Sequence, residues 1–308
     1  LIDKIKIVGF VGNLIKKFYI NNNTFYVAAS NSLVVDKKYR QYTLLLLRKF
    51  FNQKKIDFYL NTTPNSATSK IWKKLNSSKI PIKNMDKIQL YFIDIKSVIN
   101  SYFLKKKFFF FIKLNKAIPS IYKNIFYKKI NYVEDKNILI KKFNKIEKNF
   151  ELFFKKYKSS TKKITLSRDK IWFNLHYKDK INKNKAWLFT ATKNKKIIGF
   201  IGCVEDSNNS IKLKRVKICD LIVLNDNKKV INSLIHKALC EITKKKYHLV
   251  ETQGFSNTKF QCIKEIFHKS RSSGPYPYSF ICNSKKLMPL LKNKKLWDFS
   301  LVDGDNLL

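Results

Sequence analysis

One eight-residue phrase occurs twice in the chain, and this repeat constrains the fold more than any other feature. Lys6–Asn13 reads KIVGFVGN, and Lys196–Cys203 reads KIIGFIGC. Both are short β-branched and apolar runs that contain glycine, which is typical of strands at a sheet edge or bend. A phrase that returns after about 190 residues predicts a duplicated unit, provided that the elements behind each copy also correspond.

The elements behind the first copy follow the order strand, helix, strand, helix. Asn31–Asp36 predicts a strand, Thr43–Phe51 a leucine-rich helix, and Ile56–Asn61 a second strand. A further helix follows Thr62–Ala67. Asn65 suits its N-cap, because the asparagine side chain can accept a backbone N–H.

The elements behind the second copy follow the same order. Cys219–Leu224 and Tyr247–Thr252 predict strands, and Lys229–Lys244 predicts a helix. A last helix follows Gly254–Thr258, with Asn257 as the expected cap. The two copies correspond at offsets of about 188 to 192 residues, which indicates one duplicated domain.

The duplication predicts two contiguous domains. We expect a first domain over 1–97, closed by a strand at Gln89–Lys96, then a connector over 98–130 and a second domain over 131–308. Elements that the first copy lacks precede the second phrase, namely helices about Ile138–Tyr157 and Ser167–His176 and a strand at Ala186–Thr192. The first copy is therefore expected to be N-terminally incomplete.

The formal net charge of +43 raises the question of a nucleic-acid partner. Only five of the 64 basic residues are arginine, the side chain that grips phosphate with a planar fork: Arg40, Arg48, Arg168, Arg215 and Arg271. A lysine excess of this kind favours drift in composition over a dedicated nucleic-acid surface. The run Ser101–Lys129 mixes lysines with aromatics and could stack bases, but a connector packed onto the domains is the preferred interpretation.

The five cysteines form no C-x-x-C pair and share no ligand spacing with the four histidines, so we expect neither disulfides nor a metal site. Buried thiols in a reducing cytoplasm are the expected state. No signal peptide is visible behind Leu1, and the apolar run Phe108–Ile112 is too short to cross a bilayer.

The most informative passage is Ser32–Phe51, where a strand runs through a charged turn into a helix. The first amides of a helix lack intrahelical partners, and the helix dipole adds positive charge there. Such a helix start is suited to binding a pyrophosphate. Arg40 stands at this turn in a chain with few arginines, so it carries more weight than the lysines around it.

This passage resembles the GNAT N-acetyltransferases, which transfer an acetyl or other acyl group from acyl-CoA. The resemblance rests on VVDKKYRQYTLLLL, Val34–Leu47, and NTTPNSATSKIWKKL, Asn61–Leu75. It implies an α/β (α+β) fold of two GNAT-like domains, each a mixed, mostly antiparallel twisted sheet flanked by helices. Leu221–Leu239 keeps strand and helix without the arginine turn and resembles a degenerate second copy.

The resemblance also implies a cofactor site in the first copy. Amides of the turn would hold the pyrophosphate, amides of the preceding strand would pair with the pantetheine arm where neighbouring strands splay, and an asparagine would begin the next helix. The residues at these positions are Leu33, Val34, Val35, Arg40, Gln41, Tyr42, Thr43, Leu44, Leu45 and Asn65. Thr43 and Leu45 stand where the family has small residues.

Catalytic residues are not identified by the resemblance. Trp72 occupies the position of a tyrosine that serves as general acid in the family, and an indole cannot give up its N–H as a phenol can. Candidates for holding an amine or hydroxyl acceptor are Asn13, Trp72, Glu251, Asp303 and Asp305. A solvent-facing strand end for Glu251, and a simple terminal turn for Asp303 and Asp305, are the competing interpretations.

Three functions follow as alternatives. The first is an acyl-CoA-dependent transferase acting on a small-molecule, glycan or amine acceptor. The second is an aminoacyl transferase that resembles the peptidoglycan-bridge enzymes and uses charged tRNA, which a basic surface would attract. The third is a non-enzymatic nucleic-acid-binding protein, whose affinity would fall steeply with salt.

Overall fold

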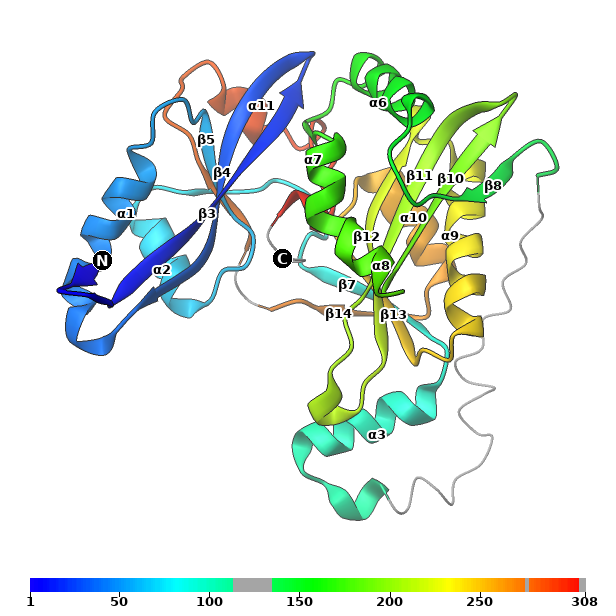
Figure 1. Ribbon diagram of the computed structural model, residues 1–308, viewed down its shortest axis with the longest axis horizontal. Coiled ribbons are helices and arrows are strands. Elements are labelled where there is room, and N and C mark those ends of the chain that lie inside the picture. The colour runs from blue at the N-terminus through cyan, green and yellow to red at the C-terminus, as the bar shows by residue number, and fades with distance from the viewer. Residues whose placement is uncertain (113–134, 275–276, 305–308) are drawn as a thin grey trace. The chain divides into compact units, whose positions relative to one another are not determined.

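The computed structural model describes residues 1–112, 135–274 and 277–304 (Figure 1). The chain forms two compact units, and each is assembled from separated segments. The first unit comprises Leu1–Met85, Thr161–Ser167 and Gly274–Leu308, and the second comprises Asp86–Ser160 and Arg168–Ser273. These boundaries differ from the contiguous segments 1–97 and 131–308 that the repeat led us to expect.

The first unit contains a six-stranded sheet in the order β6-β15-β5-β4-β3-β9. Its one parallel pair is β4 with β5, and every other neighbouring pair is antiparallel. The strands are β3 Gly9–Ile20, β4 Asn23–Val35, β5 Phe58–Asn61, β6 Ser78–Lys79, β9 Thr165–Leu166 and β15 Ser279–Ile281, with a small hairpin of β1 Ile2–Asp3 and β2 Lys6–Ile7 beside them.

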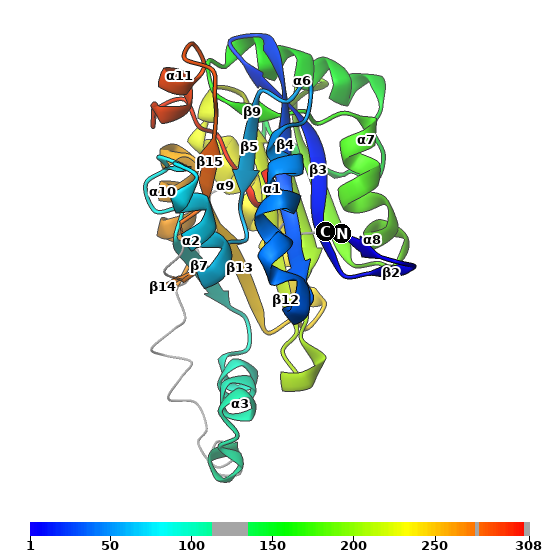
Figure 2. The same cartoon turned by 90° about the vertical axis from the view of Figure 1, so that its left-hand side faces the viewer.

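Helices α1 Thr43–Phe51 and α2 Ser66–Lys74 lie on one face of this sheet (Figure 2). Phe50 of α1 and Trp72 of α2 pack with Ala28 and Tyr59 of the sheet in one buried cluster. The predicted cap is confirmed, since Asn65 Oδ1 accepts from the Thr68 amide at 2.9 Å. The unit also contains the short helix α11 Met288–Lys292 and the 3-10 turns η1 Lys37–Tyr42 and η5 Leu301–Asp303.

The second unit contains a seven-stranded sheet in the order β14-β7-β13-β12-β11-β10-β8. Again one neighbouring pair is parallel, β12 with β13, in an otherwise antiparallel sheet. The strands are β7 Lys87–Phe92, β8 Leu139–Lys142, β10 Ala186–Lys193, β11 Lys196–Glu205, β12 Arg215–Val223, β13 Leu249–Gln253 and β14 Lys269–Ser272. Both sheets therefore match the mixed, mostly antiparallel class that was predicted.

Helices cover both faces of the second sheet (Figure 1). Ile201 of β11 faces the core beneath α9 Lys228–Lys244 and α10 Asn257–Ile266. Its neighbour Phe200 points the other way and contacts the rings of Phe150 and Trp172. Phe150 belongs to α6 Lys148–Ser160, and Trp172 belongs to α7 Lys170–Phe173, which continues through η2 Asn174–Lys178 into α8 Asp179–Asn182. The unit also contains α3 Ile95–Lys106 and the turns η3 Asn209–Ile211 and η4 Leu224–Asp226.

The repeated phrase has a packing reason in the second unit. Gly199 lies beneath α9, where a Cβ would come within 2.9 Å of Val230 and 3.0 Å of Leu234. Gly12 and Gly202 occupy the same place in the two sheets, each beside a bulge and each against a neighbouring group that leaves no room for a Cβ. Glycine is needed at these positions so that other groups can approach the strand.

The two units exchange their last strands. Gln89–Lys96 was expected to close the first domain, but β7 lies in the second sheet between β13 and β14. Reciprocally, β15 follows β14 in the chain and lies in the first sheet between β5 and β6 (Figure 2). The first sheet therefore takes two strands, β9 and β15, from beyond residue 160, and the second sheet takes β7 from before residue 100.

Three local predictions need correction. Leu139–Lys142 is not the start of a helix but an edge strand paired with β10, and α6 begins only at Lys148. The cap of α10 is Ser256, not Asn257. Helix α3 crosses the predicted boundary at 97, because Asp94 accepts from the Ser97 amide at 3.1 Å and so caps a helix there. Residues 113–129 of the lysine and aromatic run lie outside the described part of the chain.

In the described part of the chain, no helix is long and apolar enough to span a membrane.

Candidate functional site

The first sheet opens between β4 and β5. The two strands pair only over Val27–Ala29 and Phe58–Leu60. Strand β4 then continues to Val35 with β3 as its only ladder partner in the described residues. The Ser30 hydroxyl, which donates to the Leu60 carbonyl at 3.3 Å, marks the point where β4 and β5 part. Strand β4 therefore continues past its pairing with β5, as the splay predicted from the resemblance requires.

A bulge lies in β4 directly beyond this point. Phe10 pairs with Val34 and Gly12 pairs with Asn31, so the ladder leaves Ser32 and Leu33 opposite a single residue of β3. Ser32 has a φ of 51°, a left-handed conformation that is uncommon for residues other than glycine. The bulge breaks the alternation of the strand at the two residues that border the opening.

The turn after β4 is basic and exposed. Arg40 and the two lysines that precede Tyr39, Lys37 and Lys38, carry positive charge, and the first turn of α1 contains no acidic residue. The acidic neighbour Asp36 pairs with Lys6 at 3.5 Å, and the Tyr39 hydroxyl donates to Asp3. The turn is thus held by contacts with residues of the N-terminal hairpin, while Arg40 faces solvent.

Fewer backbone amides are free to bind a phosphate at this turn than the resemblance led us to expect. The Thr43 amide donates to the Arg40 carbonyl, so it is not available to a phosphate. The side chains of Leu44 and Leu45 are 64% and 51% exposed and do not contribute to the core. The arrangement leaves an exposed helix start with one arginine, without the glycine-lined loop of the resembled family.

The acceptor candidates fall in different places. Asn13 lies on β3 opposite Ser30, beside the opening, and its amide donates to Gln53. Trp72 is buried in the core under α2 and contacts Phe51, so it is placed for packing. Asp305 lies outside the described residues.

Asp303 lies in a buried turn of the first unit. It caps the turn through the amide and hydroxyl of Ser300. The Lys16 ammonium, from β3, donates to the carbonyls of Val302 at 3.0 Å and of Gly304. Gly304 packs so closely against Thr62, at the end of β5, that a Cβ there would overlap the threonine side chain. No pattern in the sequence indicates that a lysine of β3 would be buried under this turn.

In the second sheet β12 pairs with β13 only over Arg215–Ile218, and polar side chains are buried around the bulge that follows at Cys219. Gly202 pairs with Asp220 beside the bulge, and Arg168 binds the Asp220 carboxylate with two bonds of 2.9 Å. The Arg168 guanidinium also lies 5.4 Å from the ring centre of Trp172. The Tyr177 hydroxyl contacts Cys219 at 3.4 Å and occupies the space above Gly202.

The buried polar groups at this bulge are either uncharged or joined in an ion pair. Burial raises the pKa of the Tyr177 phenol well above its ordinary value and that of the Cys219 thiol to about 12. Both therefore keep their protons near neutrality. An ion pair and two uncharged groups are therefore buried at the bulge of the second sheet, whereas Ser32 at the bulge of the first sheet is exposed.

Glu251 is buried, so the competing interpretation that it lies at a solvent-facing strand end is wrong. Its side chain is 5% exposed and accepts from Arg215 at 3.0 Å and from Arg271 at 3.1 Å. Arg215 also binds Asp206, whose carboxylate pairs with Lys217 at 2.8 Å. Glu251 is thus the centre of a charge network in the second unit.

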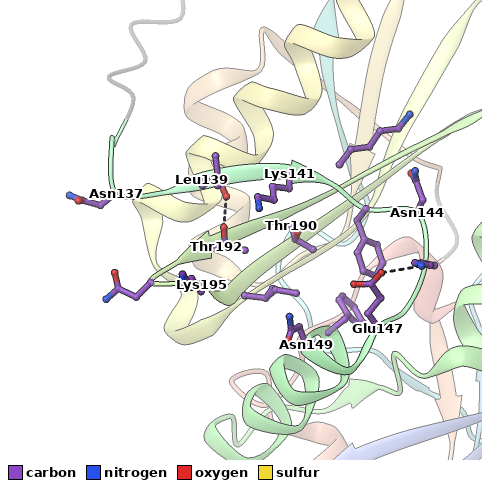
Figure 3. Close-up of a pocket in the computed structure, with 15 residues that line it drawn as sticks. Asn137, Leu139, Lys141, Asn144, Glu147, Asn149, Thr190, Thr192 and Lys195 are labelled. Carbon is purple, nitrogen blue, oxygen red and sulfur yellow. Dashed lines mark hydrogen bonds and ion pairs between the residues drawn. The ribbon is translucent and has the colours of Figure 1, made fainter.

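A cavity of about 890 Å³ opens beside β8 and the start of α6 (Figure 3). Lys141, Lys195, Asn144 and Asn149 are among its lining residues, and none of the predicted site residues lines it. In the wall of the cavity, the Thr192 hydroxyl of β10 donates to the Leu139 carbonyl of β8 at 3.0 Å. Because lysine dominates the whole chain, positive charge does not distinguish this cavity as a ligand site.

No family profile and no curated protein sequence matches the chain. Among solved structures, N-myristoyltransferase of Saccharomyces cerevisiae with bound myristoyl-CoA is similar to it with a TM-score of 0.53 and 12% identity, over 92% of this chain and 65% of that chain. A GCN5-related N-acetyltransferase from Anabaena variabilis is similar with a TM-score of 0.51 and 9% identity, over 88% of this chain and 58% of that chain. The chain thus spans less than two thirds of the length of either protein.

Proposed function

The chain has the GNAT-like N-acyltransferase fold, and from that premise we propose that it transfers an acyl group from acyl-CoA to an amine or hydroxyl acceptor. The observation that carries the proposal is the opening between β4 and β5 beside the bulge at Ser32. It supplies main-chain donors at a gap in the sheet, in a unit where no side-chain ion pair of the described residues fills that gap.

The first unit is proposed to hold the acyl-CoA. Its pantetheine arm would lie along Leu33, Val34 and Val35, where β4 has lost its partner β5. The pyrophosphate would lie at the start of α1, within reach of Arg40 and the remaining amides of the turn. The second unit is not proposed for this role, because the ion pair of Arg168 with Asp220 and the Tyr177 hydroxyl are buried against its bulge.

The chemical step needs a polarised thioester carbonyl. The acceptor nitrogen or oxygen attacks the carbonyl carbon, the new bond forms, the C–S bond breaks, and CoA leaves as the thiolate. The amides of Ser32 and Leu33, left out of the ladder by the bulge, would donate to the carbonyl oxygen as negative charge develops on it. Donors held rigidly at such a point stabilise the transition state without reorganising. The proton of the amine or hydroxyl acceptor would pass to solvent.

We propose a fatty acyl group in preference to an acetyl group, because the N-myristoyltransferase structure that resembles the chain holds myristoyl-CoA. Calorimetric titration of the chain with myristoyl-CoA and acetyl-CoA tests both donors. Binding of neither would remove the proposal. Activity that requires charged tRNA in place of acyl-CoA would instead support the aminoacyl transferase alternative.

The turn is tested by Arg40→Ala, with Arg48→Ala on the following helix α1 as the control. A charge-assisted hydrogen bond is worth about 1.5–3 kcal/mol, so Arg40→Ala should raise the Kd for acyl-CoA at least about ten-fold. Arg48 lies in the last turn of α1, away from the turn, and its loss should change the Kd little. Equal effects of the two substitutions would show that only overall charge attracts the ligand.

A further inference from the structure

We propose that the second unit contains a separate binding site for an amphipathic anion, a ligand with an apolar body and a single anionic head. The site is the α3 groove, a depression of about 1000 Å³ between α3, the turn η3 and the strands β7, β12, β13 and β14. It lies wholly within the second unit, so it does not depend on the acyl-CoA site proposed for the first.

The groove occupies a face of the sheet that α9 and α10 do not cover. Tyr91 and Val250 point into the core beneath these helices. Their neighbours Leu90, Phe92 and Leu249 point to the opposite face and line the groove. Of the three, Leu90 and Phe92 are only partly buried, so the floor of the groove is apolar and accessible.

Helix α3 supplies the second apolar wall. Ile95, Val98 and Ile99 line the groove and are only partly buried. An amphipathic helix normally buries such a stripe against a neighbouring element. Here the stripe faces a space large enough for a ligand, and pockets of this size with mostly apolar walls are typical of small-molecule sites.

The charged groups of the groove select an anion. Lys105, Lys269, Arg215 and Arg271 line it, and Glu251 is its one acidic residue. Both oxygens of Glu251 are already used, one by each arginine. The carboxylate therefore fixes the two guanidinium groups and leaves an excess of positive charge for a ligand.

Arginine at this place is informative because the chain has so few. Two of its five arginines are in this one groove. Arg271 is 47% exposed, and among the described residues its one bond is to Glu251 through a single nitrogen. A guanidinium has five N–H donors in a planar fork, so the remaining donors of Arg271 can bind a carboxylate or phosphate in two-pronged fashion.

Dodecanoate is the probe, titrated into the full chain by calorimetry below its micelle concentration. Dodecyl phosphate distinguishes a phosphate from a carboxylate head, and dodecyltrimethylammonium carries the same tail with a cationic head. We expect saturable binding of one or both anions at one site and at least ten-fold weaker binding of the cation. Equal binding of cation and anions would overturn the proposal.

Substitutions locate the site. Arg271→Ala should weaken anion binding about ten-fold or more, and Arg271→Lys should retain part of the affinity. Val98→Asp changes the apolar wall without touching the Glu251 network and should weaken binding as well, so the test stands even if Arg271→Ala misfolds. Arg40→Ala in the first unit should bind as the parent does. Loss of dodecanoate binding in Arg40→Ala, with retention in Arg271→Ala and Val98→Asp, would place the probe in the acyl-CoA site and refute the groove.

Discussion

Arg168 and Asp220 form a fully buried ion pair in the second unit, with the arginine 2% and the aspartate 0% exposed. Two bonds of 2.9 Å join them, and Trp172 lies against the guanidinium. The first unit instead presents an exposed Ser32 at the bulge of its sheet. The bulge of the second sheet is thus covered by a buried ion pair, whereas the bulge of the first sheet is accessible.

Removal of one partner of this pair should destabilise the second unit strongly. A lone buried charge costs about 3–5 kcal/mol, so Arg168→Met and Asp220→Asn should each lower the free energy of unfolding by an amount of that order. The double variant Arg168→Met with Asp220→Leu should recover most of the loss. Urea unfolding followed by tryptophan fluorescence measures the change. The exposed pair of Lys6 and Asp36 is the control, since Asp36→Asn should cost at most about 1 kcal/mol.

Ser32 should prefer glycine for stability, because a left-handed backbone costs about 1–2 kcal/mol per non-glycine residue. We expect Ser32→Gly to stabilise the first unit by about 0.5–1 kcal/mol and the β-branched Ser32→Val to destabilise it by more than 1 kcal/mol. Ser30→Gly, on the same strand without a positive φ, is the control and should destabilise. Thermal unfolding of the three variants decides, and stabilisation by both glycines would contradict the bulge geometry.

The exchanged strand predicts that the two units respond differently to truncation. Deleting 274–308 removes β15 and the turn over Asp303 from the first unit but leaves every strand of the second sheet in place. Hydrogen exchange should therefore show lost protection at β5, with β12 and β13 still protected. Equal loss of protection in both sheets would indicate that the units do not fold as separate bodies.

The alkaline stability of the second unit should depend on Cys219. Its pKa of about 12 in the folded state exceeds the value of about 8.5 for an exposed thiol, so between these pH values the folded state binds one more proton. Stability is then present below pH about 8.5 and falls as pH rises towards 12, by up to about 1.4 kcal/mol per pH unit. Urea midpoints at pH 7, 9 and 10.5 should fall less for Cys219→Ala than for the parent. Parallel declines would contradict this assignment.

Local and repeated features of the fold were predictable from the sequence. The bounds of α1 and the cap at Asn65 follow from apolar spacing and side-chain chemistry within a few residues. The repeated phrase predicts two sheets of one design, because each copy carries the same glycine beside its bulge. The similarity between the two sheets also includes strands whose sequences are not alike.

Features that depend on distant partners were not predictable. The sequence of β7 favours a strand but does not say which sheet it joins, since β13 lies about 160 residues further on. Glu251 is buried because Arg215 and Arg271 reach it from two other strands. Lys16 is buried because the Val302 carbonyl, in a turn far along the chain, accepts a hydrogen bond from its ammonium.

The exchange of strands also has a consequence for synthesis on the ribosome. The first half emerges with β5 as an unpaired edge, and the strand that covers it, β15, is made more than 200 residues later. At about 5–20 residues per second, that edge stays open for at least about ten seconds on every nascent chain. An open edge is a template for pairing with other chains, so this protein should depend on chaperones during translation more than a protein whose halves close independently.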